Sequence, residues 1–357
     1  MAYTAINKST DNFECKLWTG NETDNRDITG FSFQPDFAWI KARNNAYGHA
    51  LFDAVRGVNK YLTTVNDSAE ADQPSSGYIS QFNSDGYRLK HGSSTFRNVN
   101  DSDSSTTYVS WNWKANGQGS ANNDGSINTT YTSANTTAGF SIVKWTGTGS
   151  AGTLGHGLGV APKVVMTKNT INAYNWCMYH ESNGNTKALY PNLSSTGATS
   201  STFWNDTSPT NSVFSIGSDL AVNKSGSAII AYCFAEKKGF SKFGSYTGNG
   251  NVDGPFVYTG FKPAFLLIKS STYAGNWLMY DNKREIQNIA SGTPINANEA
   301  NAESTATNYA IDFLSNGFKL RNNNGNIQNN TETMFYLAFA AEPLVANVGS
   351  GIPATAV

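Results

Sequence analysis

A glycine-rich stretch is the first candidate for chemistry. Gly147, Gly149 and Gly152 match the G-x-G-x-x-G pattern that binds the pyrophosphate of a dinucleotide. That chemistry needs a helix N-terminus directly after the glycines, because its free N–H groups bind the phosphates. The next residues, Thr153 to Gly159, contain three more glycines and cannot form a helix. We therefore interpret the stretch as a turn and expect no cofactor.

Histidine and cysteine residues show no spacing typical of a metal site. The four histidines form no His-x-x-x-His pair, and no Cys-x-x-Cys pair is present, so we expect no zinc site. The three cysteines, Cys15, Cys177 and Cys233, lie in apolar strand patterns. We expect them to be buried reduced thiols, because a disulfide framework needs an even number of cysteines. No Gly-x-Ser-x-Gly nucleophile motif occurs.

Two aspartates recur with an arginine three residues later, as Asp53 with Arg56 and Asp281 with Arg284. A glycosidase would need two carboxylates that face one cleft. An Asp-Arg pair at the exit of a strand is more typical of a structural ion pair. We predict a structural role for the four residues, with a catalytic role as the alternative, and we predict that the chain is not an enzyme.

Aromatic rings beside Asn, Asp and Ser side chains can form a carbohydrate-binding surface. Trp176 and Trp277 are candidates, although core packing is the alternative for each, since Trp-x-x-Tyr places its two rings on opposite faces of a strand. Trp204, Asn205 and Asp206 lie in a polar stretch found only once in the chain. We predict these five residues as contacts to a glycan or a partner.

The elements that position these residues are written three times, which is an internal repeat. Six residues separate a proline from a lysine in each copy (41−35, 168−162, 269−263), and 11 residues separate that lysine from an aromatic residue (52−41, 179−168, 280−269). Each copy closes on an alternating apolar strand, and such strands between turn signals predict an antiparallel sandwich. The chain is therefore expected to be all-β, with three tandem antiparallel β-sandwich repeats.

The predicted boundaries follow from these landmarks and from a Gly/Ser/Asn/Thr-rich stretch that is typical of a linker. That linker should allow the first repeat to pivot. The predicted segments are 1–114 (repeat 1), 115–139 (linker), 140–235 (repeat 2), 240–341 (repeat 3) and 342–357 (C-terminal tail).

Composition restricts the possible partners. A net charge of −1 provides no electrostatic attraction for nucleic acid or an anionic membrane. No apolar run reaches the roughly 20 residues of a spanning helix, so we expect no membrane insertion. The first residues lack the basic and apolar regions of a signal peptide.

Six stretches of the sequence carry a resemblance to a known family: Phe33–Lys41, Val55–Leu62, Gly155–Pro162, Gly254–Lys269, Asn276–Arg284 and Ile311–Arg321. They resemble a repeated domain of tailed bacteriophages, especially marine and cyanobacterial ones. The resemblance covers about residues 13–343 and implies a tail-fibre-like virion structural protein with no catalytic residues. It also implies that the three β-sandwich repeats are lectin-like, of jelly-roll or concanavalin-like type.

Three roles remain open on this resemblance. The first is a tail appendage that contacts the host surface and has a host-surface glycan as a partner. The second is a capsid decoration or cement protein, which the lack of heptads and of a fibre shaft favours. The third is a glycan-degrading tailspike. The resemblance places the protein in the virion after synthesis in the host cytoplasm, with other virion proteins as partners and with homo-oligomerisation on a symmetric particle.

Overall fold

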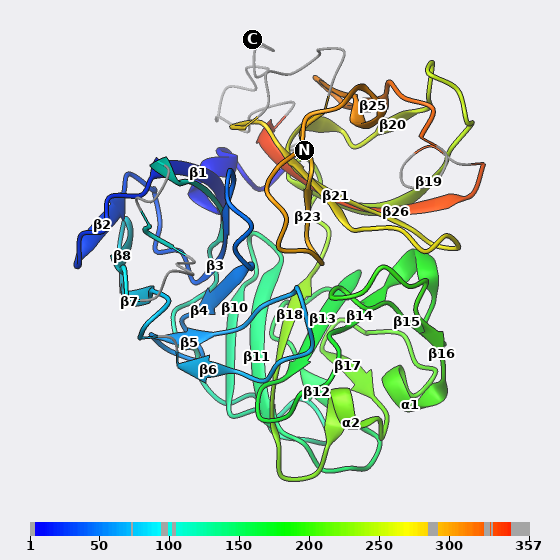
Figure 1. The fold of residues 1–357 in the computed structure, drawn as a ribbon. Coiled ribbons are helices and arrows are strands. Elements are labelled where there is room, and N and C mark those ends of the chain that lie inside the picture. Colours follow the sequence, from blue (N-terminus) through cyan, green and yellow to red (C-terminus); the bar gives the residue numbers. More distant parts are fainter. Residues whose placement is uncertain are drawn as a thin grey trace.

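The chain folds into antiparallel β-sheets joined by turns and a few short helical segments (Figure 1). This arrangement confirms the predicted all-β class. It follows from a composition rich in aromatic and β-branched residues, which favour strands, and in Gly and Asn, which favour turns. The computed structural model describes residues 4–72, 74–93, 99–101, 105–284, 292–324, 329 and 331–343.

Three large sheets share one strand order, in which the last strand of each unit lies between the first strand and the lysine-bearing strand. We call residues 13–113, 140–234 and 241–343 the first, second and third units. The first sheet is β1 (Phe13–Thr19), β9 (Thr107–Trp113), β3 (Phe37–Ala42) and β4 (Ala50–Asp53). The second is β10 (Tyr131–Asn135), β11 (Phe140–Thr146), β18 (Ala228–Phe234), β13 (Val164–Asn169) and β14 (Cys177–His180). The third is β19 (Ser241–Thr247), β26 (Thr333–Pro343), β21 (Phe261–Ser270), β22 (Leu278–Asp281) and β23 (Ile295–Asn296).

A smaller sheet accompanies each large one. These sheets are β2 (Arg26–Thr29), β8 (Gly86–Lys90) and β7 (Tyr78–Asn83); β12 (Gly152–Gly155) and β17 (Val213–Ile216); and β20 (Phe256–Tyr258), β25 (Gly317–Leu320) and β24 (Ile311–Leu314). Short pairs and helical segments complete the fold. They are β5 (Lys60–Tyr61) with β6 (Ala71–Asp72), β15 (Lys187–Ala188) with β16 (Ala198–Thr199), α1 (Ser201–Trp204), α2 (Leu220–Asn223) and the 3-10 turns Ser9–Asp11, Glu181–Asn183 and Thr307–Tyr309.

The central strands of each large sheet are buried on both faces. Successive side chains of a strand point to opposite faces, so each of these strands contributes to two cores. In β9, Tyr108 packs toward the small sheet of its own unit, where it joins Tyr87 of β8 in one cluster. Trp111 and Trp113 point the other way, into a cluster that draws residues from all three units. Burial on both faces explains why these strands read as nearly continuous apolar runs.

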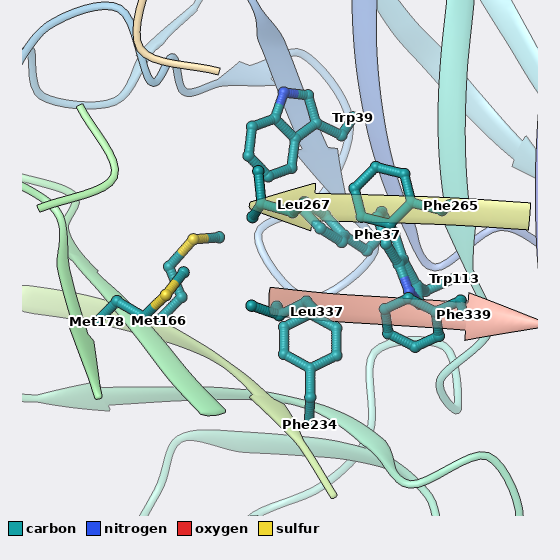
Figure 2. Close-up of a pocket in the computed structure, with 10 residues that line it drawn as sticks. All are labelled: Phe37, Trp39, Trp113, Met166, Met178, Phe234, Phe265, Leu267, Leu337 and Phe339. Atoms are coloured by element: carbon teal, nitrogen blue, oxygen red, sulfur yellow. The ribbon is translucent and has the colours of Figure 1, made fainter. Parts of the chain in front are cut away.

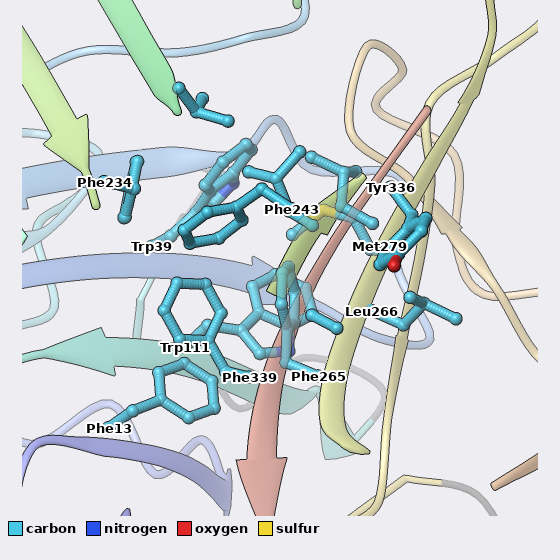
Figure 3. Packing of buried hydrophobic residues seen from close by; sticks show 14 of the residues in the cluster. Phe13, Trp39, Trp111, Phe234, Phe243, Phe265, Leu266, Met279, Tyr336 and Phe339 are labelled. Atoms are coloured by element: carbon cyan, nitrogen blue, oxygen red, sulfur yellow. The ribbon is translucent and has the colours of Figure 1, made fainter. Parts of the chain in front are cut away.

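The central cluster joins the three units into one body (Figure 3). Phe37 of the first unit stacks on Tyr232 of the second, with ring centroids 4.2 Å apart, and Phe13 stacks on Phe339 of the third at 5.1 Å. A small apolar cavity of about 20 Å³ remains where the three large sheets meet (Figure 2). Its lining residues are Phe37, Trp39, Trp113, Met166, Met178, Phe234, Phe265, Leu267, Leu337 and Phe339.

The predicted linker at 115–139 contains regular structure. Its end forms β10, which pairs with β11, and Asn135 Nδ2 donates to Asn12 Oδ1 (3.0 Å) and Lys114 O (3.2 Å). The expectation that the first unit pivots on this segment is therefore wrong, since packing and hydrogen bonds fix both of its ends.

Two further expectations differ at the third unit. A proline is expected at the start of a strand, where its missing N–H costs no hydrogen bond of the sheet. Pro263 instead lies inside β21, which starts at Phe261, and the register shifts on both sides of the proline. The last strand, β26, extends to Pro343, two residues past the predicted boundary. The predicted C-terminal tail from residue 344 onward lies outside the described residues.

Candidate functional site

The residues predicted to contact a glycan are mostly core residues. Trp204 is only 2 % exposed, because α1 is capped by Ser200 and turns the indole inward, where Nε1 donates to Lys187 O (2.9 Å). Asn205 and Asp206 follow it at the surface, each with a positive φ. The predicted aromatic contact at this loop is therefore wrong.

Trp176 and Trp277 are also closed to solvent, with exposures of 0 % and 1 %. Each lies in the central cluster, while Tyr179, three residues after Trp176, packs in the separate core of the second unit. The Trp-x-x-Tyr pattern does place its rings on opposite faces, but both faces are buried. One of these faces looked like possible surface in the sequence, because the unit that covers it lies far away in the chain.

The indole N–H groups of these tryptophans instead join one unit to the next. The same contact recurs around the molecule, with a histidine at the third interface. The three contacts are Trp176 Nε1 to Thr63 O (2.7 Å), Trp277 Nε1 to Tyr190 O (3.0 Å) and His49 Nε2 to Asn296 O (3.0 Å). They run from the second unit to the first, from the third to the second and from the first to the third. The interfaces therefore form a closed ring.

His49 completes this ring as a neutral donor. Burial lowers the pKa of its imidazole well below the usual value, and the positive charge of Lys41 lowers it further. Trp39 Nε1 can only donate, and it bonds His49 Nδ1 at 2.8 Å, so the ring hydrogen lies on Nε2. That hydrogen is donated to Asn296 O, as the indole hydrogens are donated at the other two interfaces.

The recurring lysines are buried beside the same interfaces. Lys168 Nζ donates to Asp67 O of the first unit (3.0 Å), and Lys269 Nζ donates to Ser194 O of the second (3.0 Å). Lys41 bonds carbonyls of its own unit, at Ala42 and Asn45. Burial lowers the pKa of Lys41 to about 7 and the pKa values of Lys168 and Lys269 to about 8. Their repeated spacing was visible in the sequence, but their role between units was not.

A buried ionic triad lies at the interface between the first and second units. Arg56 Nε donates to Asp53 Oδ2 (2.5 Å), and Arg56 Nη1 donates to Glu70 Oε2 (3.2 Å). Tyr232 of the second unit donates its hydroxyl hydrogen to Asp53 Oδ2 (2.7 Å). Burial raises the pKa of Tyr232 well above its usual value, which keeps the hydroxyl protonated as a donor.

The third unit builds the same triad against the first. Arg284 Nε donates to Asp281 Oδ2 (2.6 Å), and Arg284 Nη1 donates to Glu303 Oε2 (3.2 Å). The fourth member is Trp111 of the first unit, whose Nε1 donates to Asp281 Oδ2 (3.1 Å). The guanidinium carbon of Arg284 also lies 5.8 Å from the centroid of the Trp111 ring. The structure thus brings each predicted Asp-Arg pair together and adds a glutamate and a donor that sequence analysis missed.

The corresponding positions of the second unit are uncharged. His180 and Asn183 stand where the other units have Asp and Arg, and Gly197 stands where they have Glu70 and Glu303. Gly197, Glu70 and Glu303 each lie eight residues past a residue that pairs with the strand after the lysine-bearing strand (70−62, 197−189, 303−295). His180 Nδ1 accepts from Ser182 N (3.2 Å), so its Nε2 hydrogen is donated to Tyr336 O (3.3 Å). Burial lowers the pKa of His180 to about 4, so the imidazole is neutral.

The described residues contain no group of three or more His, Cys, Asp or Glu side chains that could hold a metal ion. Cys15, Cys177 and Cys233 are buried free thiols, and burial raises the pKa of each. No helix among the residues described by the structure is long and apolar enough to cross a membrane.

A family model matches most of the chain. Curated proteins gave no match to the chain. One family spans 8–343, and therefore all three units and the segment between the first two, so the unit that it defines is the whole ring rather than one repeat. The chain belongs to this family, which is described as a domain of unknown function (DUF7483).

Proposed function

We propose that the chain is a non-enzymatic structural protein of a bacteriophage virion, built from three tandem β-sandwich repeats that close into a pseudo-three-fold ring. The proposal combines the resemblance of stretches such as Phe33–Lys41 and Asn276–Arg284 to phage repeats with the geometry of the interfaces. Its role in the particle is mechanical. The ring presents a rigid block to its neighbours.

The observation that carries the structural role is the closed cycle of inter-unit contacts. The Trp176–Thr63 and Trp277–Tyr190 contacts follow the order of the chain, whereas His49–Asn296 joins the two ends of the ring. Because the last contact closes the cycle, each unit is held by two others, and relative motion of any unit breaks buried hydrogen bonds at two interfaces.

The charged side chains support a non-enzymatic role. The carboxylates of Asp53 and Asp281 are fully buried, and each is neutralised by an arginine. A glycan-degrading tailspike would need two carboxylates that reach one substrate cleft. The carboxylates of Asp53 and Asp281 lie in different interfaces, where each binds an arginine.

We place the block on the phage tail, as a compact appendage that contacts the host surface. Decoration of the capsid is a second candidate, and the pseudo-three-fold arrangement favours it. A symmetric shell offers three-fold positions, and a body of matching symmetry can contact three neighbours there in the same way. Several copies of the chain would then be arranged by the symmetry of the particle.

A particle reconstruction tests the proposal. We expect density for the ring at a repeated external position, on the tail in the first case and at three-fold or quasi-three-fold capsid positions in the second. Absence of the chain from purified particles, by reconstruction and by mass spectrometry of virion proteins, would contradict the virion role itself.

A further inference from the structure

The small sheets of the three units each end in an edge strand, β2, β12 or β20. Ile28, Leu154 and Val257 occupy corresponding places in them, each paired with an aromatic residue of the neighbouring strand. An unprotected edge strand can bind another chain through its free N–H and C=O groups. Two of the three edges are protected, each in a different way, and the third is not.

The edge of β12 is covered by the chain itself. Ile127 forms a parallel bridge with Leu154, and its N–H donates to Thr153 O (3.0 Å). The N–H of Thr153 in turn donates to Ser126 Oγ (2.9 Å). The side chain of Ile127 packs against the core of the second unit. The segment at 126–127 therefore acts as a short added strand.

The edge of β2 is protected by charge. Asp27 lies on its exposed face and forms two hydrogen bonds of 2.8 Å with Arg88 of β8. Arg26 adds a second charge on the same strand. Charged side chains at an edge discourage pairing with another strand.

The edge of β20 has neither form of protection. Pro255 O and the Thr259 N–H bond toward β25, so strand alternation turns the main-chain groups of Phe256 and Tyr258 outward. Within the described part of the chain, no segment bridges to this edge. Phe256 and Tyr258 are 44 % and 57 % exposed, and they stand where β2 has Asp27 and Thr29.

We propose that the open edge of β20 binds an extended segment of another protein chain, which adds to the small sheet of the third unit as a parallel strand beside Val257. The pairing of Ile127 with Leu154 is the internal template for this contact. By that template the incoming segment carries an aliphatic residue opposite Val257. Its main chain bonds Phe256, and its side chains pack on the two exposed rings.

The size of the patch favours strand addition over a broad protein interface. Phe256 and Tyr258 together expose roughly 200 Å² of surface. A stable interface of ordinary type buries about 800 Å² on each partner. Strand addition needs less area because main-chain hydrogen bonds supply affinity.

Charges beside the edge favour an uncharged segment. Lys319 Nζ lies 2.9 Å from Asp253 Oδ1, and Arg321 Nε bonds Asp312, so the nearby cations already have carboxylate partners. A strongly acidic or basic segment would gain nothing at this edge. In a virion, this site would give the protein a defined contact to a neighbouring protein. The inference rests on the proposed function only for the identity of the protein that supplies the segment.

A synthetic peptide with the sequence of Asn122–Thr130 provides a direct probe, because this segment includes the natural cover of β12. The full chain is titrated with the peptide, and amide hydrogen exchange is measured at Phe256 and Tyr258. We expect saturable binding that slows exchange at both amides by at least about tenfold. A peptide with Asp in place of Ile127 should not bind.

Two variants separate main-chain pairing from side-chain contact. Phe256→Pro removes an outward N–H without removing a bond to β25, so the protein should fold and lose at least about tenfold in affinity. Phe256→Thr introduces the residue type of Thr153 at this position, keeps the N–H and should still bind. Loss of affinity in Phe256→Thr equal to that in Phe256→Pro would overturn strand addition.

Other outcomes would also overturn the inference. They are protection of both amides in the free chain, no peptide binding at millimolar concentration, or binding without protection of these amides. Saturation by maltotriose, with loss in Phe256→Thr and no amide protection, would assign the rings to carbohydrate instead. Because purified protein is used, the result is independent of whether the chain is found in virions.

Discussion

Two interfaces of the ring contain buried charges, at Arg56 and at Arg284, whereas the corresponding place in the third interface contains the neutral His180. Around Arg56 and around Arg284, two carboxylates and a donor from the neighbouring unit surround a buried guanidinium. At the corresponding place, the second unit has a neutral histidine that bonds a main-chain carbonyl of the third.

In the second unit the Asp, Arg and Glu positions are all replaced together, and so is the donor position of the neighbouring unit. The four positions therefore form a matched set. Removing one partner of a buried ion pair costs about 3–5 kcal/mol, whereas replacing the whole pair can be nearly neutral. The donors follow the same rule. Tyr232 and Trp111 meet aspartates, while Leu337, at the corresponding place in its strand, meets no carboxylate. The residue set of one unit is therefore matched to the unit beside it.

Asp281→Ala should have the largest effect, because it leaves the buried Arg284 without its closest carboxylate. We expect a loss of about 3–5 kcal/mol in the free energy of unfolding, measured by denaturant titration. Asp72→Ala removes the exposed pair with Lys60 and should cost less than about 1 kcal/mol. Equal losses in the two variants would show that burial of the triad is not what matters.

Acid should weaken the neutral interface through His180. Its pKa is about 4 in the folded chain against an ordinary 6.5, so between these values the unfolded state binds more protons. The contribution of the neutral His180 to the free energy of unfolding is complete above pH 6.5. It is lost as pH falls toward 4, and the total loss is on the order of 3 kcal/mol. His180→Gln should flatten this part of the stability curve. An unchanged slope in the variant would assign the acid sensitivity to other groups.

Transplanting the neutral set into the first unit should cost less than breaking the charged one. The quadruple variant Asp53→His, Arg56→Asn, Glu70→Gly and Tyr232→Leu removes charge and counter-charge together. We expect its free energy of unfolding to exceed that of Asp53→Ala. If the quadruple variant is the less stable of the two, the residues do not act as a set.

Much of the fold was predictable from local patterns. The fixed proline-to-lysine spacing identified three strands that occupy corresponding places in their sheets, and alternating apolar residues identified the closing strands. The Asp-Arg spacing correctly suggested contact, because both residues lie within one turn. These features depend on residues close together in the chain.

Features that depend on neighbouring units were not predictable. Trp176 and Trp277 resembled surface aromatics because the carbonyls that receive their N–H groups lie 113 and 87 residues away in the chain. Glu70 and Glu303 were missed because they stand 17 and 22 residues after their aspartates (70−53, 303−281), so no common spacing marks them. Trp204 was misread because its polar neighbours hide an inward turn at α1.

A cut in the connection between the first and second units tests the closed ring most directly. A protease site inserted after Asn123, in an exposed turn, allows the folded chain to be cleaved. We expect residues 1–123 and 124–357 to elute together at micromolar concentration and to unfold in one transition, since the first unit is held by both neighbours. Separation of the fragments, or a separate melting transition for the first unit, would contradict the account.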